Sequence, residues 1–243
     1  MNILSQNKIK QIRGLHQKKN REEQGLFLVE GEKMVLEVLR NAPQLVRYCV
    51  LVEGFENELV KRTENYVCSA EELKKISTLT TPNKLIAVVE KLTFFSEEPS
   101  LILALDSVQD PGNLGTILRA ADWFGIKKII CSKTTVDCYN TKVIQASMGS
   151  FLRVEVVYLD LLDYLAKTNL PIYGALLEGE NVYHSKLETP GILLMGNEGN
   201  GISEELKQFI SHPVTIPQFG SAESLNVAVA TSILLSEFAR RIN

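Results

Sequence analysis

The sequence predicts an α/β protein with a parallel-sheet C-terminal domain and a smaller α/β domain before it. From residue 101 onward, apolar strand-like runs alternate with helical patterns, and the runs lack an alternating polar face. Strands of that kind are buried on both sides, as in a parallel sheet covered by helices. Shorter strand and helix patterns up to about residue 91 indicate a separate unit.

In the N-terminal unit, a basic helix-like start precedes a short apolar run, and Gly31 then separates this strand from a helix. Ser69 is a typical N-cap for a later helix. The predicted strands are 26–30, 46–52 and 85–89, and the predicted helices are 33–39 and 70–76. Charges and a proline break the periodicity at 93–100, so we predict domains at 1–92 and 101–243 joined by a linker.

The C-terminal elements follow in regular alternation. The predicted strands are 101–105, 128–131, 154–159, 172–177 and 192–195, and the predicted helices are 116–124, 141–148, 161–167 and a long one after Ser224. Because parallel sheets bind ligands at the carboxyl ends of their strands, we expect the functional site in the loops that follow these strands.

Composition excludes several classes of protein. A chain of 243 residues with 45% hydrophobic content can bury an ordinary core, and no run reaches the roughly 18 apolar residues that a membrane span needs. Cys49, Cys68, Cys131 and Cys138 form no C-x-x-C pair, which argues against a disulfide scaffold or a zinc site. The three histidines lack metal-ligand spacing, so we expect no metal. The missing apolar run predicts no membrane association, and the scattered cysteines favour a cytoplasmic location.

Charge is distributed unevenly along the chain. The net charge is −3, yet the first 21 residues contain six basic residues and no acid: Lys8, Lys10, Arg13, Lys18, Lys19 and Arg21. Such a segment can meet nucleic-acid phosphates, since each neutralised phosphate releases counterions. The alternative is a solvated helix face.

The first candidate loop runs from Leu105 to Gly125 and joins a strand end to a helix through a Pro-Gly turn. The free N–H groups of that helix start favour an anion, and Arg119 is predicted about one turn into the helix. The alternative is that Asn113 caps the helix and Arg119 pairs with Asp122. Trp123 and its neighbour Phe124 are interpreted as core residues.

The second loop, 193–203, carries glycines at 196, 199 and 201 that let a ligand approach bare backbone. It matches neither the dinucleotide fingerprint nor the P-loop, which argues against an oxidoreductase or a nucleotide hydrolase. Glu198 is a functional carboxylate or a solvated loop residue. In the third segment, 214–240, Ser224 and Asn226 open an apolar helix, where they either satisfy free N–H groups or hold a ribose.

Together the three segments resemble the signature motifs of the SpoU (TrmH-like) family of RNA ribose 2′-O-methyltransferases, in the SPOUT superfamily. Motif one lies at 110–125, motif two at 195–201 and motif three at 216–230, in the family's order. The segment Phe27 to Lys33 resembles the start of the SpoU substrate-binding domain, whose fold is related to ribosomal protein L30e.

The resemblance implies a C-terminal α/β domain with a deep trefoil knot, which is an exception to the rule that chains do not knot. It also implies a homodimer that completes each catalytic site, and S-adenosyl-L-methionine as the methyl donor, bound mainly by backbone groups. The matching cofactor positions are Met195, Gly196, Asn197, Gly201, Ile216 and Leu225. The matching catalytic positions are Arg119, Asn113, Glu198, Ser224 and Asn226.

The implied function is methyl transfer to a ribose 2′-hydroxyl of structured RNA, with rRNA favoured over tRNA because of the N-terminal domain. The hydroxyl must be positioned and lose its proton. Because guanidinium stays protonated, Arg119 is expected to address a phosphate or the hydroxyl, while Asn113 and Asn226 orient the ribose. Ser224 shapes the pocket, and Glu198 supports the loop or Arg119. The alternatives are a non-catalytic RNA-binding assembly protein with the same fold, or methyl transfer to a base.

Overall fold

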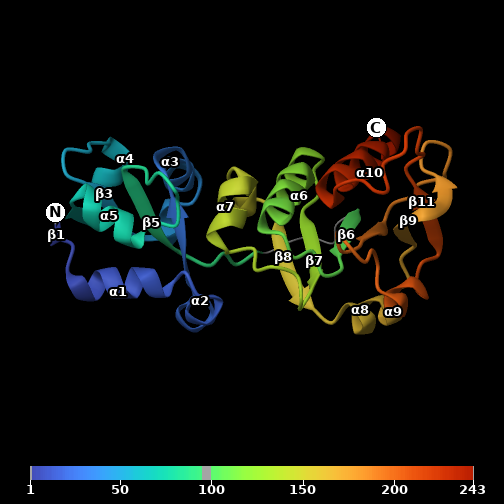
Figure 1. Ribbon diagram of the computed structural model, residues 1–243, viewed down its shortest axis with the longest axis horizontal. Coiled ribbons are helices and arrows are strands. Elements are labelled where there is room, and N and C mark those ends of the chain that lie inside the picture. The colour runs from blue at the N-terminus through green and yellow to red at the C-terminus, as the bar shows by residue number, and fades with distance from the viewer. Residues whose placement is uncertain (1, 95–99, 243) are drawn as a thin grey trace. The chain divides into compact units, whose positions relative to one another are not determined.

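The structure is a computed structural model that describes residues 2–94 and 100–242 (Figure 1). It consists of two compact units, one of residues 1–93 with 139–152 and one of residues 94–138 with 153–243. Most of the predicted linker, 95–99, lies outside the described residues. The predicted domain boundaries stay a prediction.

The N-terminal unit is built on a five-stranded mixed sheet with the strand order β1-β4-β3-β5-β2. Its strands are β1 (Asn2–Ile3), β2 (Leu26–Glu30), β3 (Val46–Val52), β4 (Asn65–Cys68) and β5 (Leu85–Glu90). Its helices are α1 (Gln6–Gly14), α2 (Lys18–Gln24), α3 (Glu32–Asn41), α4 (Glu58–Lys61) and α5 (Ala70–Ile76), with the 3₁₀ turn η1 (Pro43–Leu45). The three predicted strands and the two predicted helices are confirmed to within two residues at each end. Strands β1 and β4 and helix α4 are too short for periodicity to reveal.

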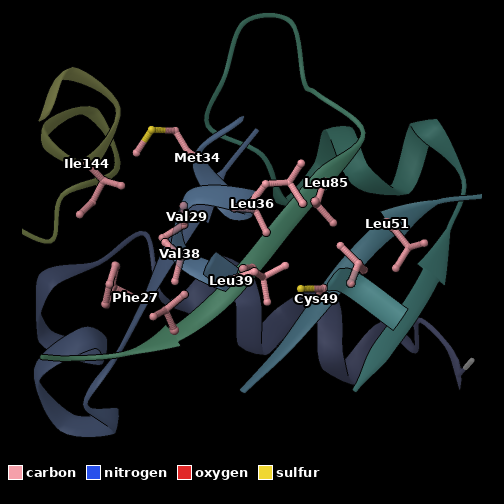
Figure 2. Close-up of a cluster of buried hydrophobic side chains, with 14 of the residues drawn as sticks. Phe27, Val29, Met34, Leu36, Val38, Leu39, Cys49, Leu51, Leu85 and Ile144 are labelled. Atoms are coloured by element: carbon pink, nitrogen blue, oxygen red, sulfur yellow. The ribbon is translucent and has the colours of Figure 1, made fainter. Parts of the chain in front are cut away.

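The sheet has a separate hydrophobic core on each face. Successive residues of a strand contribute to different cores, because their side chains point alternately to the two faces of the sheet. Phe27 and Val29 pack with α3 on one face, and Leu28 packs with α1 and α5 on the other. The first of these cores also contains Ile144 of α7 (Thr141–Ser147) and Phe151 of η2 (Ser150–Leu152), as Figure 2 shows for Ile144. Residues 139–152 thus belong to the N-terminal unit although they follow strand β7 in the sequence.

The basic N-terminal segment is partly structural. Arg21 is 3% exposed, and its guanidinium donates to the carbonyls of Leu15 and His16 at 2.8 and 2.9 Å. Lys18 and Lys19 each lie 3.8 Å from a glutamate one turn later. Arg21 was counted among the candidate phosphate contacts, and its burial corrects that prediction, because its donors are used within the protein.

The C-terminal unit contains a six-stranded sheet in which every neighbouring pair is parallel, with the order β11-β9-β10-β6-β7-β8. The strands are β6 (Leu101–Leu105), β7 (Lys128–Ser132), β8 (Glu155–Leu159), β9 (Ile172–Asn181), β10 (Gly191–Met195) and β11 (His212–Thr215). The predicted parallel sheet is confirmed. Strand β11 was not predicted because its proline is unusual in a strand, and β11 lies at the sheet edge, where proline is tolerated.

Helices cover both faces of this sheet (Figure 1). On one face lie α6 (Pro111–Trp123) and α10 (Val227–Ile242), and on the other lie α8 (Leu161–Lys167) and α9 (Glu204–Lys207). Helix α6 begins five residues before its predicted start, because Asp110 caps it by accepting the backbone N–H of Asn113 at 2.8 Å. Arg119 therefore lies more than two turns into the helix, and the prediction of one turn was wrong.

Trp123 is exposed, contrary to its interpretation as a core residue. Its side chain is 84% exposed and that of Phe124 is half-buried. The buried stripe of α6 is formed by Leu114, Ile117, Leu118 and Ala121, and Trp123 lies outside that stripe at the last residue of the helix.

Among the described residues, no helix is long and apolar enough to cross a membrane, and no group of three or more His, Cys, Asp and Glu side chains could hold a metal ion. All four cysteines are buried thiols that form no disulfide among the described residues. Burial raises the pKa of Cys49 and Cys68 to about 11, so both stay protonated near neutral pH and are poor nucleophiles.

Candidate functional site

The first two candidate loops start side by side. Strands β6 and β10 are neighbours near the middle of the sheet, with Leu105 opposite Met195, and the N–H of Asp106 extends this pairing by donating to the Met195 carbonyl at 2.9 Å. The carboxyl ends of both strands therefore open at the same point of the sheet edge, where parallel sheets place their ligands.

The second loop turns back on itself immediately after β10. Asn197 and Gly201 exchange backbone hydrogen bonds of 2.9 and 3.0 Å, and the Asn197 side chain accepts the N–H groups of Gly199 and Asn200. A Cβ on Gly196 would lie 2.1 Å from the Gly201 carbonyl carbon, so this close approach requires glycine. Gly201 itself has φ +69°, in the left-handed region.

Side chains from all three segments meet in one hydrogen-bonded chain. The Asn113 amide donates to a Glu198 carboxylate oxygen at 2.9 Å, and the Asn226 amide donates to the Asn113 Oδ1 at 2.9 Å. The structure thus brings Asn113, Glu198 and Asn226 together. The alternative in which Asn113 caps its own helix is wrong, because Asp110 fills that role.

Asn226 satisfies free N–H groups at the start of the last helix, which is the first of the two alternatives considered for it, while the second, that it holds a ribose, stays a prediction. Its Oδ1 accepts the backbone N–H groups of Ala228 at 2.9 Å and Val229 at 3.3 Å, so it caps α10. Its Nδ2 is the group that reaches Asn113. The Asn226 side chain therefore caps α10 and also connects it by a hydrogen bond to Asn113 in the first turn of α6.

Arg119 and Ser224 are not part of the hydrogen-bonded group formed by Asn113, Glu198 and Asn226. Arg119 follows Asn113 by six residues on α6, which places it about 240° around the helix and about 9 Å along it. Both side chains are exposed and have no hydrogen-bond or ion-pair partner within residues 2–94 and 100–242. The alternative partner of Arg119, Asp122, instead pairs with Arg153 at 2.8 Å.

The positions expected to hold a cofactor carry free backbone groups. Met195 and Gly196 are buried, Ile216 is half-buried and Leu225 is 49% exposed. The backbone N–H groups of Gly196, Ile216 and Leu225 have no hydrogen-bond partner in the described part of the chain. Because buried N–H groups are almost always paired, the free donor of Gly196 is suited to a ligand. The residues therefore fit a cofactor held mainly by backbone groups.

Two residues of this region, Asp106 and Ser107, were not among the predicted site residues. They link the loops that follow β6, β7 and β10 through hydrogen bonds described below. The available signal was an acidic residue placed directly after an apolar strand.

Replacing Asn226 separates its two roles. Asn226→Asp keeps the capping oxygen but loses the amide donor to Asn113, so we expect reduced turnover with little change in thermal stability. Asn226→Ala loses both and is expected to cost about 1 kcal/mol more in the free energy of unfolding. Denaturant unfolding and methyl-transfer assays measure the two effects, and equal turnover in the Asp variant and the unaltered protein would contradict a role for the amide bridge.

Comparison with known proteins identifies both parts of the chain. The family model described as SpoU rRNA Methylase family matches residues 100–236, and the one described as MRM3-like substrate binding domain matches residues 6–87. The 23S rRNA (guanosine(2553)-2′-O)-methyltransferase RlmP of Bacillus subtilis is 32% identical over 234 residues, covering 94% of both chains.

Solved structures resemble the whole chain. A TrmH-family protein from Porphyromonas gingivalis is 40% identical, with a TM-score of 0.83 and coverage of 98% of this chain and 99% of that one. An AdoMet-bound rRNA methyltransferase from Sinorhizobium meliloti is 29% identical, with a TM-score of 0.86 and coverage of 100% and 98%. These matches confirm the predicted fold class, an α/β-knot domain preceded by a small α/β domain.

Proposed function

This chain belongs to the SpoU rRNA Methylase family, and we propose that it methylates ribosomal RNA through residues of its three motif segments. It is an RNA ribose 2′-O-methyltransferase that uses S-adenosyl-L-methionine, as its sequence predicted. One observation carries the assignment of the site: Asn113 links Glu198 and Asn226, so that all three motifs meet at one point. The N-terminal unit, which matches a substrate-binding domain, is proposed to hold the RNA.

S-Adenosyl-L-methionine supplies an electrophilic methyl group when it is bound. The chain's part is to hold this cofactor through the free N–H groups of Gly196, Ile216 and Leu225, lined by Met195, Asn197 and Gly201. A neighbouring RNA hydroxyl must then be aligned with the methyl group, and such positioning lowers the barrier by removing translational and rotational freedom in advance.

Asn113 can align that hydroxyl. Its amide has two N–H groups and its oxygen two lone pairs, and the structure uses one of each for Glu198 and Asn226. One donor and one acceptor remain for a ribose. Glu198 and Asn226 thereby fix the orientation of the Asn113 amide.

Arg119 is proposed to act on the phosphate or on the reacting hydroxyl of the RNA. Its guanidinium stays protonated, so it stabilises negative charge that develops on the oxygen rather than accepting the proton. Ser224 is exposed beside the capped end of α10 and is proposed to line the ribose pocket.

In a homodimer, Arg119 of one copy can act at the catalytic site of the other copy. Thr116, Arg119 and Trp123 follow one exposed stripe of α6, and Trp123 is 84% exposed. Val229, on the packed neighbour α10, is 48% exposed. We propose that a second copy of the protein covers the Trp123 and Val229 side chains. Arg119 of one copy would then reach the hydrogen-bonded side chains of Asn113, Glu198 and Asn226 in the other copy.

Trp123→Glu is expected to convert the dimer into a monomer, because a buried unpaired carboxylate at an interface is strongly unfavourable. Sedimentation velocity measures the change, and methyl transfer is expected to fall with the loss of the dimer. Leu162→Glu, at another exposed apolar position, is the control and should stay dimeric. A monomeric unaltered protein with full activity would contradict the proposal.

The test of the function uses methyl-labelled S-adenosyl-L-methionine and undermodified total RNA, followed by digestion to nucleosides. We expect the label in a 2′-O-methylnucleoside of rRNA. Label in a methylated base would move the reaction to the base, label in tRNA would change the substrate, and bound but unlabelled RNA would support an assembly factor. A cytoplasmic location stays a prediction.

A further inference from the structure

Asp106 is a buried acidic residue outside the motifs already assigned. It directly follows β6, and its side chain is almost fully enclosed, with 5% exposed. Acidic side chains are seldom buried unless their oxygens are hydrogen-bonded. Its partners therefore indicate what the carboxylate does.

Both carboxylate oxygens of Asp106 accept hydrogen bonds from loop residues. Oδ2 accepts the backbone N–H of Ser203 at 2.9 Å, and Oδ1 accepts the hydroxyl of Ser107 at 3.0 Å. Ser203 lies at the far end of the glycine-containing loop that follows β10. The carboxylate thus holds the end of that loop.

Ser107 holds the other end of the same loop. Its φ of +57° lies in the left-handed region, which is uncommon for a residue other than glycine. In this conformation its carbonyl accepts the Asn197 side-chain amide at 2.7 Å and its N–H donates to the Ser132 hydroxyl at 2.8 Å. Uncommon conformations of this kind persist only where surrounding contacts determine them.

We propose that Asp106 is a positioning residue for the cofactor: together with Ser107 it clamps both ends of residues 197–203 and so sets the place of the free Gly196 N–H. The inference rests on the proposed cofactor site. It assigns the carboxylate a hydrogen-bonding role in which negative charge is not required, because its two partners are an N–H group and a hydroxyl. The hydroxyl can donate or accept.

Asp106→Ala is expected to weaken S-adenosyl-L-methionine binding by about tenfold or more, since it removes the carboxylate that accepts the Ser203 N–H and so releases the end of the loop. At saturating cofactor, turnover should change by less than about threefold, because Asp106 touches neither the RNA nor the methyl donor. Asp106→Asn should stay within about threefold of the unaltered Kd, because the amide can accept from Ser203 and donate to Ser107.

Ser203→Pro breaks the same hydrogen bond from the other side. Ser203 has φ −61°, which proline adopts, and within the described part of the chain its N–H donates to Asp106 alone. This variant should weaken cofactor binding as Asp106→Ala does, and it keeps the proposal testable if the alanine variant does not fold. Calorimetric titration with S-adenosyl-L-methionine measures the Kd of each protein.

Asp160→Ala is the matched control, since Asp160 caps α8 on the opposite face by accepting the Asp163 N–H at 3.2 Å. It should lose similar stability while keeping the cofactor Kd. Hydrogen exchange of residues 197–203 without cofactor should be faster in Asp106→Ala than in Asp160→Ala, and this readout is independent of the proposed cofactor site. Unchanged exchange, or an unaltered Kd in both Asp106→Ala and Ser203→Pro, would overturn the proposal.

Discussion

Arg119→Ala is expected to lower turnover by about a hundredfold or more while the affinity for S-adenosyl-L-methionine stays unchanged. Arg119 is exposed, has no partner among the described side chains and is not one of the residues assigned to the cofactor. Its removal therefore leaves the protein's own contacts intact and takes away only a cation that acts on the RNA. Single-turnover methyl transfer and calorimetric titration measure the two quantities.

Two further variants define the role of Arg119. Arg119→Lys keeps the charge but loses the planar set of donors, so intermediate turnover is expected. Lys207→Ala removes a basic residue from α9, on the other face of the sheet, and should leave turnover unchanged. If Arg119→Ala retained full turnover, the assignment of this residue would be wrong.

Gly196→Ala is expected to abolish measurable cofactor binding. The added Cβ would lie 2.1 Å from the Gly201 carbonyl carbon and 2.2 Å from the Ile202 nitrogen, and both are backbone atoms that cannot rotate away. The loop must shift, and with it the free N–H groups that are proposed to bind the cofactor. Calorimetric titration with S-adenosyl-L-methionine measures the loss, and thermal unfolding shows whether the fold persists.

The same loop provides the control for this substitution. Among the described residues, a Cβ on Gly199 would meet only the Asn197 side-chain oxygen at 3.6 Å, an ordinary contact. Gly199→Ala should therefore bind the cofactor normally. Equal affinities of the two alanine variants would show that the close approach at Gly196 does not shape the cofactor site.

Much of the candidate site was already visible in the sequence as three separate segments. Asn113, Glu198 and Asn226 were all selected there, but their mutual contact was not, because the bonds that join them span 85 and 113 residues. The order of the strands decides such contacts, and it places β6 beside β10. Local periodicity contains no information on that order.

The structure also decided between alternatives that the sequence left open. Asp110 caps α6, so the Asn113 amide is available to bind Glu198. Arg153 pairs with Asp122, and Arg119 has no partner among residues 2–94 and 100–242. In each case two residues carried groups suited to the same bond. Three-dimensional proximity made the choice.

The sequence by itself determined the fold class, the two-part organisation, most strands and helices, and the residues of the three motifs. The α/β class, the strands and the helices depend on local patterns such as apolar runs and capping residues, whereas the knot and the roles of the motif residues were implied by the resemblance to the SpoU family. Only the tertiary structure decided the burial of Arg21, the exposure of Trp123, the place of residues 139–152 and the clamp formed by Asp106. Each of these depends on which surfaces meet when the chain packs, and contacts between segments distant in the sequence are set by topology rather than by local propensity.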